Sequence, residues 1–157
     1  MKNKSQIKNI IEKLIKKSFP ILRRKKIYIY YFSKVPFSGG AYWILPFWRA
    51  LFINKKRKFN MEELTGLIAH ELCHFEVYQK RGWLKTNVLE ALYWISSKFR
   101  KNEERTVERM VIRKGYAKHI YKQRLSIWNS ANKYPKLKKI YMSSKEIERY
   151  AKKIGKW

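Results

Sequence analysis

The sequence predicts an α+β fold in which a small sheet precedes a set of helices. Short β-branched and aromatic runs, bounded by turn residues, occur in the first third of the chain. The remainder carries helix-start signals and apolar residues at helical spacing. With 157 residues, of which 45% are apolar, the chain can bury a sizeable core. We therefore expect one domain over residues 1–157, with an antiparallel or mixed sheet first and helices afterwards.

The chain begins with an amphipathic pattern within residues 1–20. Apolar side chains recur at helical spacing over residues 5–18, at Ile7, Ile10, Ile11, Leu14 and Ile15. Lysines lie largely on the opposite face. Such a helix usually packs against its own domain, and the alternative is that it lies on an anionic bilayer.

Three strands are expected next. Residues 27–32 (IYIYYF) have a strand composition, and Gly39-Gly40 marks a turn after them. Residues 41–45 and 49–54 then form two further short strands on either side of Pro46.

After Asn60 the pattern becomes helical. Asn60 and Glu63 form a capping box, so a helix is expected from Met61 to about Lys80, ending at Gly82. Asn87 and Glu90 predict a second start, for a helix that runs through Trp94.

A third helix is expected over residues 103–114, with Gly115 as its stop. Ser143 and Glu146 open a last helix, which Gly155 closes. Residues 116–157 are thus expected to form a C-terminal helical extension.

The charge is strongly basic. Lys and Arg number 38 against 11 acidic residues, which gives a net charge of +27. Such a surface favours anionic partners, either nucleic acid or an acidic membrane. No apolar run reaches the roughly 20 residues of a spanning helix, and Cys73 is the single cysteine. We expect a cytoplasmic protein, with peripheral attachment to an acidic membrane as the alternative.

The strongest chemical signal is an HExxH motif, His70-Glu71-Leu72-Cys73-His74, inside the predicted helix of residues 61–80. Residues i and i+4 of a helix lie on one face, so the imidazoles of His70 and His74 can converge on one tetrahedral metal ion. Glu71 is turned about 100° from His70, which suits a general base better than a ligand.

The third ligand decides between families of metal site. Position 80, where one pattern would place a histidine, holds Lys80. A SprT-like protease would need a histidine soon after the motif, but the remaining histidine, His119, lies 45 residues on. Glu104 and Glu108 share one helix face, whereas the competing Glu103 is followed at i+4 by Val107. Glu104 is therefore the best candidate.

The segments LTGLIAHELCHFE (residues 64–76) and EERTVERMVIRKGY (residues 103–116) resemble gluzincin metallopeptidases. The resemblance is to the group of CAAX prenyl proteases and the bacterial heat-shock membrane protease, and above all to its compact soluble relatives, the minigluzincins. It implies a zincin-like fold with an active-site helix and a glutamate helix. The chain departs from the family's usual Asp at the position of Glu108.

The resemblance implies a zinc metalloendopeptidase acting on a protein or peptide substrate. One Zn²⁺ per chain would be held by His70, His74 and Glu104, with Glu71 as the catalytic base. Glu108 would not bind zinc itself but would hold a zinc-binding histidine in place. An extended substrate would pair with a strand edge at Phe52, Ile53 and Asn54. The oxyanion stabiliser is left open among His119, Tyr116 and Arg109.

Two alternatives remain at this point. One is a basic nucleic-acid-binding protein in which the HExxH is structural or degenerate and the tyrosines of residues 27–32 stack on bases. The other is a SprT-like protease that acts on proteins bound to nucleic acid, which would also account for the charge.

Overall fold

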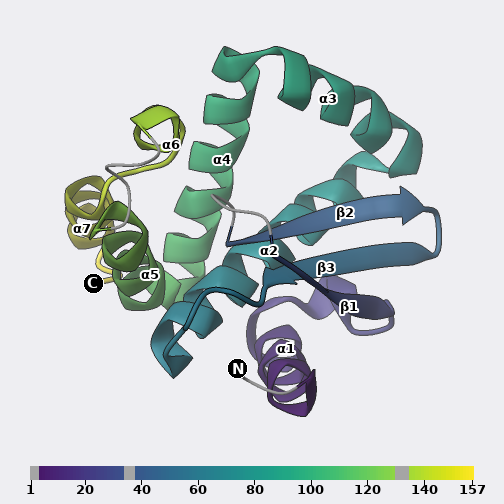
Figure 1. Ribbon diagram of the computed structural model, residues 1–157, viewed down its shortest axis with the longest axis horizontal. Coiled ribbons are helices and arrows are strands. Elements are labelled where there is room, and N and C mark those ends of the chain that lie inside the picture. The colour runs from purple at the N-terminus through teal and green to yellow at the C-terminus, as the bar shows by residue number, and fades with distance from the viewer. Residues whose placement is uncertain (1–3, 34–37, 130–134) are drawn as a thin grey trace. The chain divides into compact units, whose positions relative to one another are not determined.

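A computed structural model describes residues 4–33, 38–129 and 135–157 (Figure 1). The described chain divides into two compact units. The first comprises Met1–Lys58 and Glu71–Val88, and the second comprises Phe59–His70 and Leu89–Trp157. Two helices, α2 (Met61–Arg81) and α3 (Trp83–Ile95), each begin in one unit and end in the other. The expected α+β class and the order of sheet before helices are confirmed.

The first unit contains a three-stranded mixed sheet with the strand order β1-β3-β2. Its strands are β1 (Ile27–Phe32), β2 (Gly39–Leu45) and β3 (Trp48–Asn54), within two residues of the predicted bounds. β1 pairs parallel to β3, with Ile27 opposite Arg49, and β2 pairs antiparallel to β3, with Ala41 opposite Leu51. β3 is thus the central strand.

This topology corrects one prediction. Phe52, Ile53 and Asn54 were expected to offer a free edge to a substrate, but Phe52 and Ile53 pair with both β1 and β2. Asn54 pairs with Phe32 of β1, and its N–H donates to the Ser38 carbonyl at 2.9 Å. Its backbone groups already form the sheet ladder, so an added strand would have no donors or acceptors there. The free edges of the described sheet belong to β1 and β2.

One face of the sheet packs on the C-terminal half of α2 (Met61–Arg81). Arg49 donates to Gln79 Oε1 at 2.8 Å, and the Tyr78 hydroxyl donates to the Ala41 carbonyl at 3.4 Å. Helix α1 (Lys4–Ser18) buries Ile7, Ile10, Ile11 and Leu14. The expectation that the N-terminal helix packs on its own domain is confirmed.

The second unit is helical. It contains the start of α2 together with α4 (Ser97–Val111), α5 (Ala117–Asn129), α6 (Pro135–Ile140) and α7 (Ser144–Lys153). Gly115, at φ 87°, breaks the helix between α4 and α5 within the widened turn Ile112–Tyr116. This positive φ favours glycine. Gly115 therefore ends the helix that carries Glu104, as predicted.

The helix after α2 begins earlier than expected. Helix α3 runs over Trp83–Ile95, and Asn87 lies inside it, where its side chain donates to the Trp83 carbonyl at 2.8 Å. The predicted cap at Asn87 is therefore wrong. The next start is also earlier, because Ser96 caps α4 by accepting from Phe99 N at 3.2 Å. Ser143 and Glu146 do form the predicted capping box of α7.

None of the described helices is long and apolar enough to cross a membrane.

Helices α2 and α5 approach each other closely at Gly66. A Cβ atom built there would lie 2.5 Å from the His119 carbonyl oxygen and 2.6 Å from its carbon. Because these are backbone atoms, the α5 helix itself would have to shift.

We therefore expect Gly66→Ala to destabilise the fold by about 1–3 kcal/mol. This reverses the usual gain of about 0.5–1 kcal/mol when alanine replaces glycine inside a helix. Denaturant unfolding measures the difference. Thr65→Ala, on the adjacent and partly exposed position, is the control and should change stability by less than about 0.5 kcal/mol. A stabilised Gly66→Ala would contradict the close approach.

Candidate metal centre

The helix that carries the HExxH motif is well defined at both ends. At its start, Asn60 N donates to Glu63 Oε2 at 3.1 Å and Glu63 N donates to Asn60 Oδ1 at 2.8 Å, which is the predicted capping box. At its end, Arg81 is followed by Gly82 with a φ of 83°. His70, Glu71 and His74 therefore sit in the middle of a regular helix, where the i and i+4 imidazoles share one face.

The structure brings Glu104 to this face. Glu104 Oε2 lies 3.0 Å from His70 Nε2, and both side chains are buried. His70, His74 and Glu104 each present one ligand atom, and these atoms all lie within 4.8 Å of one another. The group could hold a metal ion. The competing Glu103 is not a member of this group. The structure therefore agrees with the choice of Glu104, which was preferred because it has an acidic residue at i+4.

The donor set fits a transition metal. Two imidazole nitrogens and one carboxylate oxygen match the open, three-ligand type of zinc site. Two ligand atoms of a tetrahedral zinc are separated by roughly 3.3 Å, close to the 3.0 Å between His70 Nε2 and Glu104 Oε2. Cys73 is fully buried and contributes no ligand atom to the group, so the described residues do not form a closed, four-ligand site.

A tyrosine that the sequence analysis missed holds the glutamate. The Tyr93 hydroxyl, from α3, donates to Glu104 Oε1. One carboxylate oxygen of Glu104 thus faces Tyr93, and the other faces His70. Tyr93 precedes Glu104 by 11 residues and belongs to another helix, so no local spacing pointed to it.

Glu108 takes a different role from the expected one. Its carboxylate accepts from the Arg124 guanidinium and from Met142 N, the latter at 2.7 Å. Its interaction with His70 is electrostatic, so Glu108 does not hold a histidine by a hydrogen bond as the resemblance implied. Complete burial raises the pKa of Glu108 above its usual range, although Arg124, His70 and Met142 N oppose the rise.

The three oxyanion candidates lie in different surroundings. Arg109 is exposed and is turned about 140° from Glu104 around α4, so it points away from the metal group. Tyr116 is buried with its ring 5.8 Å from that of His119. His119 interacts electrostatically with Glu62, near the start of α2, and is not a member of the metal group.

Tyr141 is a better-placed aromatic residue that sequence reasoning did not find. Its ring centroid lies 6.2 Å from that of His70. The Arg124 guanidinium lies 4.4 Å above the same ring. Tyr141 follows α6 and reaches His70 only through the folding of the C-terminal helices, which no spacing in the sequence encodes.

Comparison of the chain with models of protein families, with curated proteins and with solved structures gives no match.

Proposed function

We propose that the chain is a zinc-dependent metalloendopeptidase of gluzincin type, with a zincin-like fold. One observation carries the proposal: two HExxH histidines and a glutamate from a separate helix, 30 residues beyond His74 in the sequence, present their ligand atoms in one buried group. His70, His74 and Glu104 would hold one Zn²⁺ per chain. A zinc ion there would supply Lewis acidity and would lower the pKa of a bound water towards about 7.

The residues of the chain supply the proton chemistry. Glu71 is buried and is one position from His70 on the same helix. It would take the proton of the attacking water and pass it to the leaving amine. Tyr93 would fix the orientation of Glu104. Tyr141, next to His70, is the proposed oxyanion stabiliser in place of Arg109.

A substrate strand would pair with β2 rather than with β3. β2 is a free edge of the described sheet, and within the first unit it contacts α2 just after the motif, through the Tyr78 hydroxyl and the Ala41 carbonyl. The Tyr78 ring centroid lies 5.8 Å from that of His74. An extended peptide on β2 would receive backbone hydrogen bonds, as in strand addition generally.

Glutamate as the third ligand favours this function over a SprT-like one. A SprT-like site would use a histidine, and His119 is the remaining one in the chain. His119 lies near Glu62 and Tyr116 and is not a member of the metal group.

The direct test is elemental analysis of untagged protein purified without added metal. We expect about one zinc per chain, and a loss of zinc in Glu104→Ala, since a carboxylate ligand is removed. Glu103→Ala is the matched control and should keep its zinc. A wild-type chain that holds no zinc after equimolar addition and dialysis would overturn the proposal.

Tyr93→Phe tests the support of the glutamate. Removing the hydroxyl that orients a ligand is expected to lower zinc affinity by a factor of about 10–100. Competition with a chromogenic chelator measures this affinity. Tyr150→Phe, which removes a hydroxyl that accepts from Arg113 Nε at 3.1 Å, is the control and should leave zinc affinity unchanged. Equal affinities for Tyr93→Phe and wild type would mean that Tyr93 does not position Glu104.

A further inference from the structure

The outer face of α3 is an aliphatic stripe that faces solvent. It consists of Leu84, Val88, Leu92 and Ile95, whose exposed fractions are 73%, 67%, 43% and 82%. Successive members are separated by three or four residues, so they lie within an arc of about 80° on one side of the helix. We call these four residues the α3 stripe. Apolar side chains exposed to this degree in a contiguous row mark an interaction surface.

The anchored side of α3 shows that the stripe points away from the residues that hold the helix in place. Thr86 is buried and donates to the Gly82 carbonyl at 2.8 Å, and Tyr93 donates to Glu104. Both residues lie about 140–160° around the helix from the centre of the stripe. The polar anchors therefore face inward and the aliphatic side chains face outward, which is the reverse of an ordinary surface helix.

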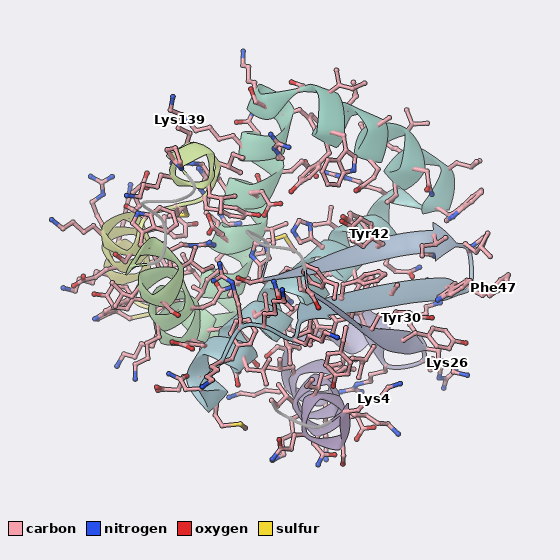
Figure 2. The ribbon with its side chains drawn as sticks, viewed as in Figure 1. Lys4, Lys26, Tyr30, Tyr42, Phe47 and Lys139 are labelled. Atoms are coloured by element: carbon pink, nitrogen blue, oxygen red, sulfur yellow. The ribbon has the colours of Figure 1, made fainter. Side chains whose placement is uncertain are left out.

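The tip of the β2–β3 hairpin, in the first unit, carries further exposed apolar side chains. Ile44, Leu45 and Phe47 are exposed there, Phe47 by 71%. Figure 2 shows the Phe47 side chain at the turn between the two strands. The Trp83 indole donates to the Ile44 carbonyl at 3.3 Å, which joins the first turn of α3 to the end of the hairpin. Trp83 lies about 140° around α3 from the centre of the stripe, so this contact anchors the helix on the side opposite the stripe.

Exposed basic residues lie near the stripe in the sequence. Lys85 lies on α3 beside the stripe, and Lys98 and Lys101 follow at the start of α4; all three are exposed. Glu90 is the one acidic residue of α3, and it accepts from the Trp94 indole at 3.2 Å. An aliphatic row with Trp and Lys at its borders suits the boundary between lipid headgroups and acyl chains.

We infer that the α3 stripe docks the protein on an anionic lipid bilayer. Helix α3 has 13 residues, fewer than the roughly 20 needed to span a bilayer, so it would lie in the plane of the interface. The net charge of +27 attracts the anionic headgroups. The same charge opposes a second copy of this chain as the partner. The inference does not depend on the proposed peptidase activity.

Nucleic acid is less favoured as the partner. Leu, Val and Ile side chains offer no ring on which a base can stack. Four aromatic residues of β1 and β3 are half-buried and pack on one another: the Tyr30 and Phe52 rings stack at 5.3 Å, and Tyr28 lies edge-on to Trp48 at 6.2 Å.

The test is binding to vesicles of phosphatidylcholine with and without phosphatidylglycerol. We expect wild type to bind the anionic vesicles. The double variant Leu84→Ser/Ile95→Ser should have a partition coefficient at least about tenfold lower, because it lacks two aliphatic side chains that wild type would bury in the lipid. Ile21→Ser/Leu125→Ser removes two exposed aliphatic side chains elsewhere and is the matched control. Because these side chains lie outside the stripe and do not enter the lipid, this control should bind within about twofold of wild type. Glu71→Gln should bind as wild type does, which separates docking from catalysis.

A labelled variant gives a second readout that does not depend on loss of binding. A polarity-sensitive dye on Val88→Cys should shift to the blue when anionic vesicles are added, and the same dye on Leu125→Cys should not. Three results would overturn the inference. They are equal binding by the stripe variant and wild type, a wild-type dimer in sedimentation that the stripe substitutions dissociate, and displacement of wild type and stripe variant alike by a single-stranded oligonucleotide.

Discussion

Glu71→Gln is expected to lower the rate of peptide hydrolysis by a factor of about 10²–10⁴, the usual contribution of a general base. Glutamine has nearly the same shape as glutamate but cannot accept the proton of the attacking water. Glu71 is not one of the three residues that present ligand atoms to the metal group. The zinc content of Glu71→Gln should therefore stay at about one per chain while its activity is lost.

Cleavage of a fluorescently labelled unfolded protein, with zinc analysis of the same samples, measures both quantities. Glu62→Gln is a matched control, because Glu62 lies on the same helix and is exposed. It should retain wild-type activity. Full activity of Glu71→Gln would assign the base to another residue. Loss of zinc and activity together would instead make Glu71 a part of the metal site.

The parts of the fold that local sequence encodes were predictable. The capping boxes of Asn60 with Glu63 and of Ser143 with Glu146 formed as expected, because both partners of a cap lie within four residues. Glu104 could be preferred over Glu103 for a similar reason, since only Glu104 has an acidic i+4 neighbour on its helix face.

Features that depend on distant segments could not be predicted. Strand composition located β3 but could not show that β3 lies between β1 and β2, which made Phe52, Ile53 and Asn54 a wrong choice of edge. The partners of Glu104 and Glu108 come from outside the motifs, from Tyr93 on α3 and Arg124 on α5. Their positions follow from helix packing and from the turn at Gly115.

The ion pair of Arg124 and Glu108 shows how strongly the second unit depends on such a distant contact. An unbroken helix would hold these residues about 24 Å apart, and the turn at Gly115 instead brings them into contact. The exposed fractions of their side chains are 3% and 0%. Arg124→Met would leave the Glu108 carboxylate buried without its cationic partner.

We expect Arg124→Met to lower the free energy of unfolding by about 3–5 kcal/mol, as when one partner of a buried ion pair is removed. The double variant Arg124→Met/Glu108→Gln should recover part of this loss, because a neutral amide costs less to bury and can still accept from Met142 N. Denaturant unfolding of the single and double variants measures the recovery.

Arg105→Met serves as the control for loss of an arginine. Arg105 pairs with Glu146 at 2.9 Å, but their side chains are 23% and 31% exposed, so water can replace the lost partner. The expected cost is about 1 kcal/mol or less. If Arg124→Met lowered the free energy of unfolding no more than Arg105→Met does, the buried Glu108 carboxylate would not need Arg124 as its partner. Glu108 would then be stabilised by His70 and the Met142 amide rather than by the guanidinium.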